Sequence, residues 1–168
     1  MNVARICSRE VSIAAPTESV VSVAKLMRDR NVGTVVIVDE GRMPVGIVTD
    51  RDIVTRVLAA GVDSRTATIG GIMTRCPRTV PAGSAPSEAL ACMRRLGVRR
   101  LPVVGERGEL VGILSVDDVL QSVAEELGNL SLVIAHSVGG ARVPTTTSDR
   151  TRPSSAAAIP RASGEVEC

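Results

Sequence analysis

The sequence predicts a mixed α/β fold of the α+β type, built from two similar units in tandem. The chain repeats itself after 66 positions, so that Gly46 aligns with Gly112, and each copy alternates strand-like with helix-like patterns. Two copies with so long a period do not make a solenoid. A unit of roughly 60 residues buries little core alone. We therefore expect two β-α-β-β-α units, over residues 6–65 and 72–128, packed about a pseudo-twofold axis.

The first copy contains these elements in order. Residues 11–14 form a short entry strand, and residues 19–31 carry apolar side chains at helical spacing. Residues 34–38 are mostly β-branched, which indicates a strand buried on both faces. A hairpin turn leads to the return strand 45–49. A second helix follows, with Asp50 as its expected N-cap.

The second copy repeats the same order. We expect an entry segment at 72–80, a helix at 84–96, strands at 101–104 and 110–115, and a helix at 117–127. In each unit, helices cover one side of the sheet. The open faces of the two sheets are then the natural seam between the units.

The end of the chain differs in composition. Residues 130–135 are apolar and either extend the last helix or pack on the module. From 139 onward Thr, Ser, Arg, Pro, Gly and Ala dominate without periodicity. Residues 139–168 are therefore expected to be a disordered tail.

Composition excludes several classes of function. The 168 residues include no Phe, Tyr or Trp, which argues against binding of single-stranded nucleic acids, because base stacking on aromatic rings normally supplies much of that binding. The net charge of only +2 implies no general affinity for polyanions. Four cysteines without CxxC spacing and one histidine predict no metal site. No membrane span or signal peptide is recognisable, so we expect a soluble, cytoplasmic protein. Lys25 is the only lysine, and this excess of arginine is typical of a GC-rich, bacterial genome.

Two strand-to-helix turns carry the polar chemistry. Residues 46–52 read GIVTDRD and residues 112–118 read GILSVDD. Both keep a hydroxyl followed three positions later by a carboxylate: Thr49 with Asp52, and Ser115 with Asp118. Unpaired amides at a helix start and a hydroxyl suit phosphate, whereas a carboxylate suits the vicinal hydroxyls of a ribose.

Helix capping is the alternative reading of these carboxylates. In the second copy Val116 replaces Asp50, while the hydroxyl-x-x-Asp pattern survives. We therefore assign capping to Asp50, and ligand binding to Thr49 with Asp52 and to their second-copy counterparts.

These motifs resemble a tandem pair of CBS domains, often called a Bateman module. The resemblance rests on residues 45–52 (VGIVTDRD), 101–104 (LPVV) and 111–118 (VGILSVDD), and it covers residues 6–127. It implies a cleft with two sites for adenosyl compounds, in which the Asp binds ribose and the hydroxyl lies near phosphate.

The resemblance also implies which residues complete each site. Those facing Asp52 are Val98, Arg99, Arg100 and Leu101; those facing Asp118 are Val32, Gly33 and Thr34; Ile13 and Val80 lie near adenine. Because Arg99 and Arg100 add two positive charges, we expect the Asp52 site to prefer di- or triphosphates, and the Asp118 site to be weaker or to accept less charged adenosyl ligands. The alternative is that both arginines are solvated surface charges.

The leading functional prediction is a non-catalytic regulatory module. The resemblance implies binding of AMP, ADP, ATP or S-adenosylmethionine, no required cofactor (Mg²⁺ only with ATP), a homodimer, and a partner protein regulated in trans. A ligand-independent interaction scaffold with the same fold is the alternative. An enzyme using acid pairs such as Asp117 and Asp118 for Mg²⁺ is disfavoured, because no P-loop, HExxH motif or nucleophile–base pair is present.

Overall fold

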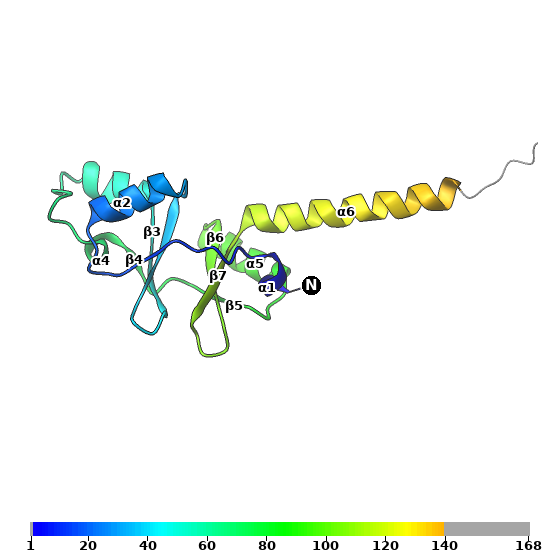
Figure 1. Cartoon of the computed structure of the whole chain (residues 1–168), viewed down its shortest axis with the longest axis horizontal. Helices are drawn as coiled ribbons and strands as arrows, with labels where there is room; N and C mark the ends of the chain where they lie inside the picture. The colour runs from blue at the N-terminus through cyan, green and yellow to red at the C-terminus, as the bar shows by residue number, and fades with distance from the viewer. Residues whose placement is uncertain (1, 140–168) are drawn as a thin grey trace, which may run out of the picture. The chain divides into compact units, whose positions relative to one another are not determined.

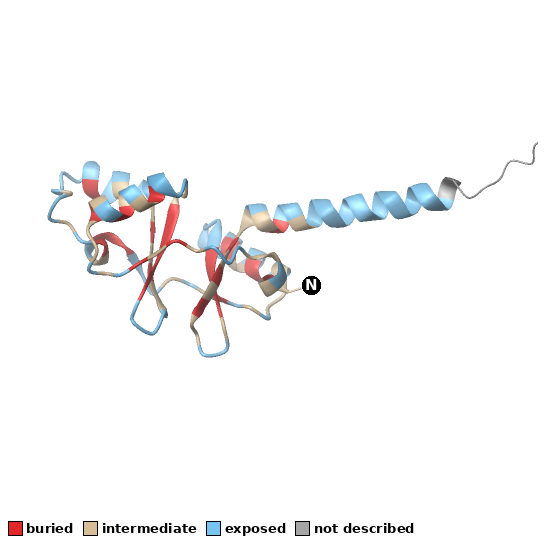
Figure 2. Cartoon of the chain, in the orientation of Figure 1, coloured by how far each residue is buried: buried red, intermediate tan, exposed pale blue. Residues whose placement is uncertain are grey.

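The computed structural model describes residues 2–139, with side chains through residue 137. Both repeats lie in one compact unit that ends at Ser131, and a second unit begins at Leu132. The first unit contains two small sheets, each with its own helices (Figure 1). The predicted α/β fold of two repeats is confirmed. Figure 2 shows that buried residues concentrate on the strands, while the helices expose their outer faces.

The first sheet has the strand order β1-β2-β3-β4. Its strands are β1 (Ile13–Ala14), β2 (Thr34–Val38), β3 (Pro44–Thr49) and β4 (Thr74–Arg75). Its helices are α2 (Val20–Asp29), α3 (Asp50–Ile53), the π-helix η1 (Val54–Leu58) and α4 (Ile69–Ile72). All of β2 is buried, as its β-branched sequence predicts. Val35 and Ile37 of β2 pack in the first repeat's own core, because successive strand residues face opposite sides of the sheet.

The second sheet has the strand order β5-β6-β7. Its strands are β5 (Val80–Pro81), β6 (Arg100–Val104) and β7 (Leu110–Ser115), and its helices are α5 (Pro86–Leu96) and α6 (Val116–Gly139). As in the first sheet, an entry strand runs parallel to the first arm of an antiparallel hairpin. Gly97 ends α5 in the left-handed conformation (φ 66°) that glycine adopts without strain.

The opening segment of each repeat packs on the other repeat. Helix α1 (Val3–Ile6) places Val3 in the core of the second repeat, where the Val3 amide donates to the Ser84 carbonyl at 2.9 Å. Helix α4, which opens the second copy in the sequence, places Ile69 in the core of the first. Strand β4 also extends the first sheet. In space, α1 therefore belongs to the second repeat's core, and α4 and β4 belong to the first, so the boundaries 6–65 and 72–128 stay a prediction from the sequence.

The seam between the sheets is aliphatic. Val36 and Val38 of β2 and Leu110 of β7 are buried together, and Val11, Ile13 and Ile113 pack around them. The two hairpins also meet, since the Leu110 amide donates to the Arg42 carbonyl at 2.9 Å. A chain without aromatic residues thus fills this seam with branched aliphatic side chains.

Helix α6 is longer than the sequence pattern predicted. The predicted helix ended at 127, whereas α6 continues to Gly139, so the apolar residues 130–135 extend the helix. Within the first unit this helix exposes Leu120, Leu127 and Leu130. The predicted disordered tail lies outside the described residues, apart from Gly139.

Candidate functional site

The first strand-to-helix turn is a closed box of hydrogen bonds between Thr49 and Asp52. Asp52 Oδ2 accepts from the Thr49 amide at 2.8 Å and from its hydroxyl at 2.7 Å, and Thr49 Oγ1 accepts from the Asp52 amide at 3.2 Å. This is a capping box, which satisfies backbone donors that the helix start leaves unpaired.

The assignment of capping to Asp50 is therefore wrong. Thr49 has extended backbone angles (φ −117°, ψ 163°) and is the N-cap, so Asp50 is already the first helical residue. Asp50 Oδ1 accepts from the amide of the adjacent Arg51 at 2.7 Å. Its Oδ2 lies over Gly33, where an added Cβ would approach it to 3.0 Å. Gly33 therefore gives Asp50 the space that it occupies.

The second turn contains the same box. Asp118 Oδ2 accepts from the Ser115 amide and from the Ser115 hydroxyl, both at 2.7 Å, and Ser115 Oγ accepts from the Asp118 amide at 3.1 Å. In both repeats, the hydroxyl-x-x-Asp pattern thus caps the N-terminus of the following helix. Capping occupies one carboxylate oxygen of each Asp, so any ligand role depends on the other oxygen and on the surroundings.

A cavity of about 240 Å³ opens beside the second turn, between the two repeats. Asp118 and Ser115 lie on one wall, and a segment of the first repeat that includes Gly33 and Thr34 lies on another. The complete lining is Ser8, Glu10, Val11, Ser12, Asn31, Val32, Gly33, Thr34, Arg100, Ile113, Ser115 and Asp118. Val32, Gly33 and Thr34 are thus placed beside Asp118, in the position where the sequence analysis expected them.

Arg100 lies in the Asp118 cavity, where it donates to Thr34 Oγ1 at 3.4 Å. Thr34 and Arg100 occupy equivalent positions 66 residues apart, so their contact lies at the pseudo-twofold axis. The sequence placed Arg100 beside Asp52, whereas in the structure its guanidinium points towards Thr34 and lines the cavity that contains Asp118. The long bond leaves most of its donors available to an anion.

Arg99 has a different environment from Arg100. Both arginines are exposed, but the Arg99 guanidinium pairs with Asp117 at 3.3 Å. An ion pair between two exposed side chains contributes little to stability. The structure thus separates the Arg99–Arg100 pair that the sequence analysis treated as one phosphate-binding feature.

The remaining predicted residues have mixed positions. Leu101 and Val80 are buried in the core of the second repeat, so their side chains do not wall a cavity. Ile13 packs in the seam, and Val98 is exposed on the surface. Residues of the N-terminal segment from Ser8 to Ser12 also line the cavity, although the sequence did not predict this. The segment crosses to the second sheet, where Ser8 bridges to Ile113.

A larger hollow of about 370 Å³ lies between η1 and α4 in the first repeat. It includes the Arg56 side chain but no carboxylate, serine or asparagine. Arg56 already donates to the Ile72 carbonyl at 2.6 Å and pairs with Asp52 at 3.1 Å. Volume alone thus favours this hollow, but the convergent polar groups favour the smaller cavity as the candidate site.

Among the described residues, no cluster of three or more His, Cys, Asp and Glu side chains could hold a metal ion. No helix in this part of the chain is both long and apolar enough to cross a membrane. Burial raises the pKa of the Cys7 thiol and outweighs the lowering effect of Arg9. Cys7 therefore has less thiolate than a solvated cysteine at the same pH.

Comparisons with known proteins agree with this fold. The family profile described as "CBS domain" matches residues 3–59 and 69–125, more than half of the chain. An uncharacterised protein of Methanopyrus kandleri is 37% identical over 121 residues, which span 72% of this chain but only 62% of that relative. The CBS domain pair of protein MJ0100, solved with 5′-methylthioadenosine and S-adenosyl-L-methionine, superposes with a TM-score of 0.66. It is 28% identical, and the match covers 75% of this chain and 98% of that one. CBSX2 in complex with AMP is 25% identical and superposes with a TM-score of 0.65; the match covers 74% of this chain and 96% of that one.

Proposed function

This chain belongs to the CBS-domain family, and we propose that it is a regulatory module that binds an adenosyl compound between its two repeats. Candidate ligands are AMP, ADP, ATP and S-adenosylmethionine. The observation that carries the proposal is the cavity in which Asp118 and Ser115 of one repeat face Gly33 and Thr34 of the other. Structural relatives solved with AMP or with S-adenosyl-L-methionine support the same class of ligand.

Each part of such a ligand has a matching group in the cavity. The Asp118 carboxylate would accept hydrogen bonds from the ribose hydroxyls. Arg100 would pair with a phosphate or carboxylate, because its planar guanidinium offers several donors. Val11, Val32 and Ile113 would supply an aliphatic wall for the base, in place of the aromatic residues that the chain lacks.

The cavity contents also suggest which ligand is preferred. Its volume of about 240 Å³ lies below the roughly 300–1,000 Å³ that is usual for ligand pockets, which favours a small ligand. Glu10 and Asp118 place two carboxylates around one arginine, so each added phosphate would meet repulsion as well as attraction. We therefore expect AMP or S-adenosylmethionine to bind more tightly than ATP, unless Mg²⁺ neutralises the triphosphate.

The signal would pass through the association of two copies. The helices after the two turns expose apolar side chains: Val54 and Leu58 on η1, and Leu120, Val123 and Leu127 on α6. Ligand binding across the two repeats would change how these surfaces meet, and a partner protein would read the change. We propose no catalytic step for the module itself.

Thermal shift measurements with AMP, ATP and S-adenosylmethionine test this function. A ligand that binds only the folded chain raises its melting temperature. We expect AMP to raise it for the unaltered chain. In Asp118→Ala the affinity should fall roughly 10- to 100-fold, because hydrogen bonds to a charged group are lost.

Asp117→Ala is the matched control, since Asp117 is exposed, adjacent in sequence and absent from the cavity lining. No shift with any of the three compounds at millimolar concentration would favour the alternative of a ligand-independent scaffold.

A further inference from the structure

We propose that the Arg56 side chain fills the ligand site beside Asp52 at the first turn, so that this chain binds one adenosyl ligand instead of two. The inference rests on the proposed function and adds to it which site is open. Its basis is the difference between two positions that the repeat makes equivalent, Arg56 and Ser122.

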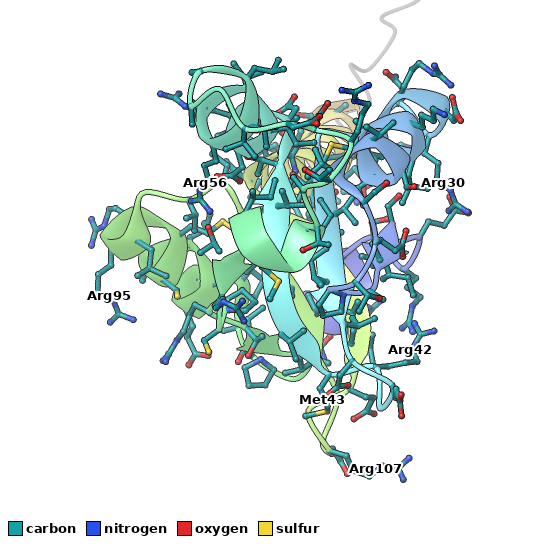
Figure 3. All side chains as sticks on the ribbon, turned by 90° about the vertical axis from the view of Figure 1, so that its left-hand side faces the viewer. Arg30, Arg42, Met43, Arg56, Arg95 and Arg107 are labelled. Atoms are coloured by element: carbon teal, nitrogen blue, oxygen red, sulfur yellow. The ribbon has the colours of Figure 1, made fainter. Side chains whose placement is uncertain are left out.

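Arg56 is held by three partners on three different elements. Its Nη2 pairs with Asp52 Oδ1 at 3.1 Å and donates to Thr74 Oγ1 at 3.0 Å, and its Nη1 donates to the Ile72 carbonyl at 2.6 Å. In Figure 3 the labelled Arg56 side chain lies beside the short helix α4, which ends at Ile72. A guanidinium fixed at both terminal nitrogens is a preorganised partner for the carboxylate.

Both oxygens of Asp52 are therefore engaged. Oδ2 accepts two bonds from Thr49 in the capping box, and Oδ1 faces Arg56. The Asp52 side chain is only 17% exposed. A ribose at this turn would have to displace the Arg56 guanidinium from Asp52 Oδ1 before that oxygen could accept a hydrogen bond from its hydroxyl groups, and neutral hydroxyl groups make weaker hydrogen bonds than a charged guanidinium.

The second turn has no such occupant. Ser122 stands where Arg56 would stand, and Asp118 makes no salt bridge among the residues that the structure describes. Asp118 lines the cavity between the repeats. Arg100 lines the same cavity and donates a hydrogen bond to Thr34. The attraction of Arg100 is thus available to a ligand.

The backbone differs between the two helices as well. After Asp52 the chain forms the π-helix η1 (Val54–Leu58), in which the Ala59 amide donates to the Val54 carbonyl at 2.9 Å. The corresponding stretch of α6 is a regular α-helix. Single π-turns are uncommon and frequently mark functional positions. This one contains Arg56, so the wider turn and the internal ion pair occur together.

Isothermal titration with AMP as the probe tests this asymmetry. We expect the unaltered chain to bind one AMP per chain. Asp52→Ala should keep that stoichiometry, with an affinity within about twofold, since its carboxylate contacts no ligand. Arg56→Ser gives the first turn the residue of the second, and the stoichiometry should rise to two per chain.

The reciprocal change supplies a second, independent readout. Ser122→Arg places an arginine four residues after Asp118, as Arg56 follows Asp52, and should weaken AMP binding roughly tenfold or more. Arg51→Ser is the matched control for Arg56→Ser, because Arg51 is exposed on α3 and stands outside the ion-paired cluster. It should leave the stoichiometry at one.

The outcomes separate the two proposals. Two equivalents of AMP bound by the unaltered chain, or loss of binding in Asp52→Ala, would overturn the internal occupation by Arg56 and leave the proposed function in place. If AMP, ATP and S-adenosylmethionine all fail to bind the unaltered chain and Arg56→Ser, the proposed function fails, and this inference with it. Should Arg56→Ser unfold, the Asp52→Ala and Ser122→Arg titrations still decide the question.

Discussion

The two strand-to-helix turns of this chain share their internal chemistry and differ in their surroundings. In both, a hydroxyl and a carboxylate close the same box, with amide-to-carboxylate distances of 2.8 Å for Thr49 and 2.7 Å for Ser115. Around the first box, Arg56 fills the space beside the carboxylate. Around the second, segments of both repeats leave a cavity of about 240 Å³. The motif thus marks a helix start in each repeat, and the neighbouring residues decide whether a ligand has room.

The helices that follow the two turns provide the largest expected effect. Leu58 and Leu120 are each 66% exposed, one after each turn. If both helices join the proposed dimer, Leu58→Glu and Leu120→Glu should each weaken association about 100-fold or more, because a charge would be buried without a partner.

Light scattering coupled to size exclusion, over a concentration series, measures this effect. A substitution at Glu40, which is exposed in the first hairpin, serves as the control. If the unaltered chain is monomeric at every concentration, or if only one of the two substitutions acts, the two helices do not share one symmetric interface.

Substitutions of Arg99 and Arg100 should have an effect of intermediate size, on the affinity for AMP. Arg100→Ala should weaken AMP binding roughly tenfold, because one charge-assisted contact to the phosphate is lost. Arg99→Ala should change it by less than about twofold, since Arg99 is paired with Asp117 on the surface. Titration of adenosine, which has no phosphate, separates a phosphate contact from a general effect: its affinity should be equal in both variants. Equal losses of AMP affinity in the two variants would contradict the placement of Arg100 in the cavity.

Loss of a capping hydroxyl should have the smallest effect, a decrease in the free energy of unfolding that is similar for the two turns. Thr49→Ala and Ser115→Ala each remove one capping hydroxyl and should each lower the free energy of unfolding by about 1 kcal/mol. Urea denaturation measures both values, and the conservative Thr49→Ser should recover most of the loss. A difference of several kcal/mol between the two alanine variants would show that the boxes are not energetically equivalent.

Much of the fold could be predicted from local patterns. The strand at residues 34–38 and the return strand ending at Ser115 have the predicted positions, because β-branched runs and hairpin turns are local signals. The exchange of α1 and α4 between the repeats could not be predicted in this way. It depends on contacts such as Val3 with Ser84, which join distant parts of the chain.

The candidate site was predicted less completely than the fold. The sequence identified Asp118 and Ser115, and the structure brings both to the cavity with Val32, Gly33 and Thr34. The sequence did not place Arg100 in the Asp118 cavity, because a repeat alignment shows which residues are equivalent but not the direction that a long side chain takes. Leu101 was assigned to a site but lies in the core. Its strand is buried on both faces, so neither face is open to a ligand.

The sequence by itself determined that the chain contains two copies of one α/β unit, and that each copy presents a hydroxyl and a carboxylate at a helix start. These features follow from periodicity and residue type, which act over a few neighbouring positions. Only the tertiary structure decided that Thr49, and not Asp50, caps helix α3. It also decided that Arg100 lines the same cavity as Asp118, and that Arg56 forms an ion pair with Asp52. Arg56 also bonds to Ile72 and Thr74, and Arg100 bonds to Thr34; these contacts join separate elements, and only the packing of those elements brings their atoms within hydrogen-bond distance.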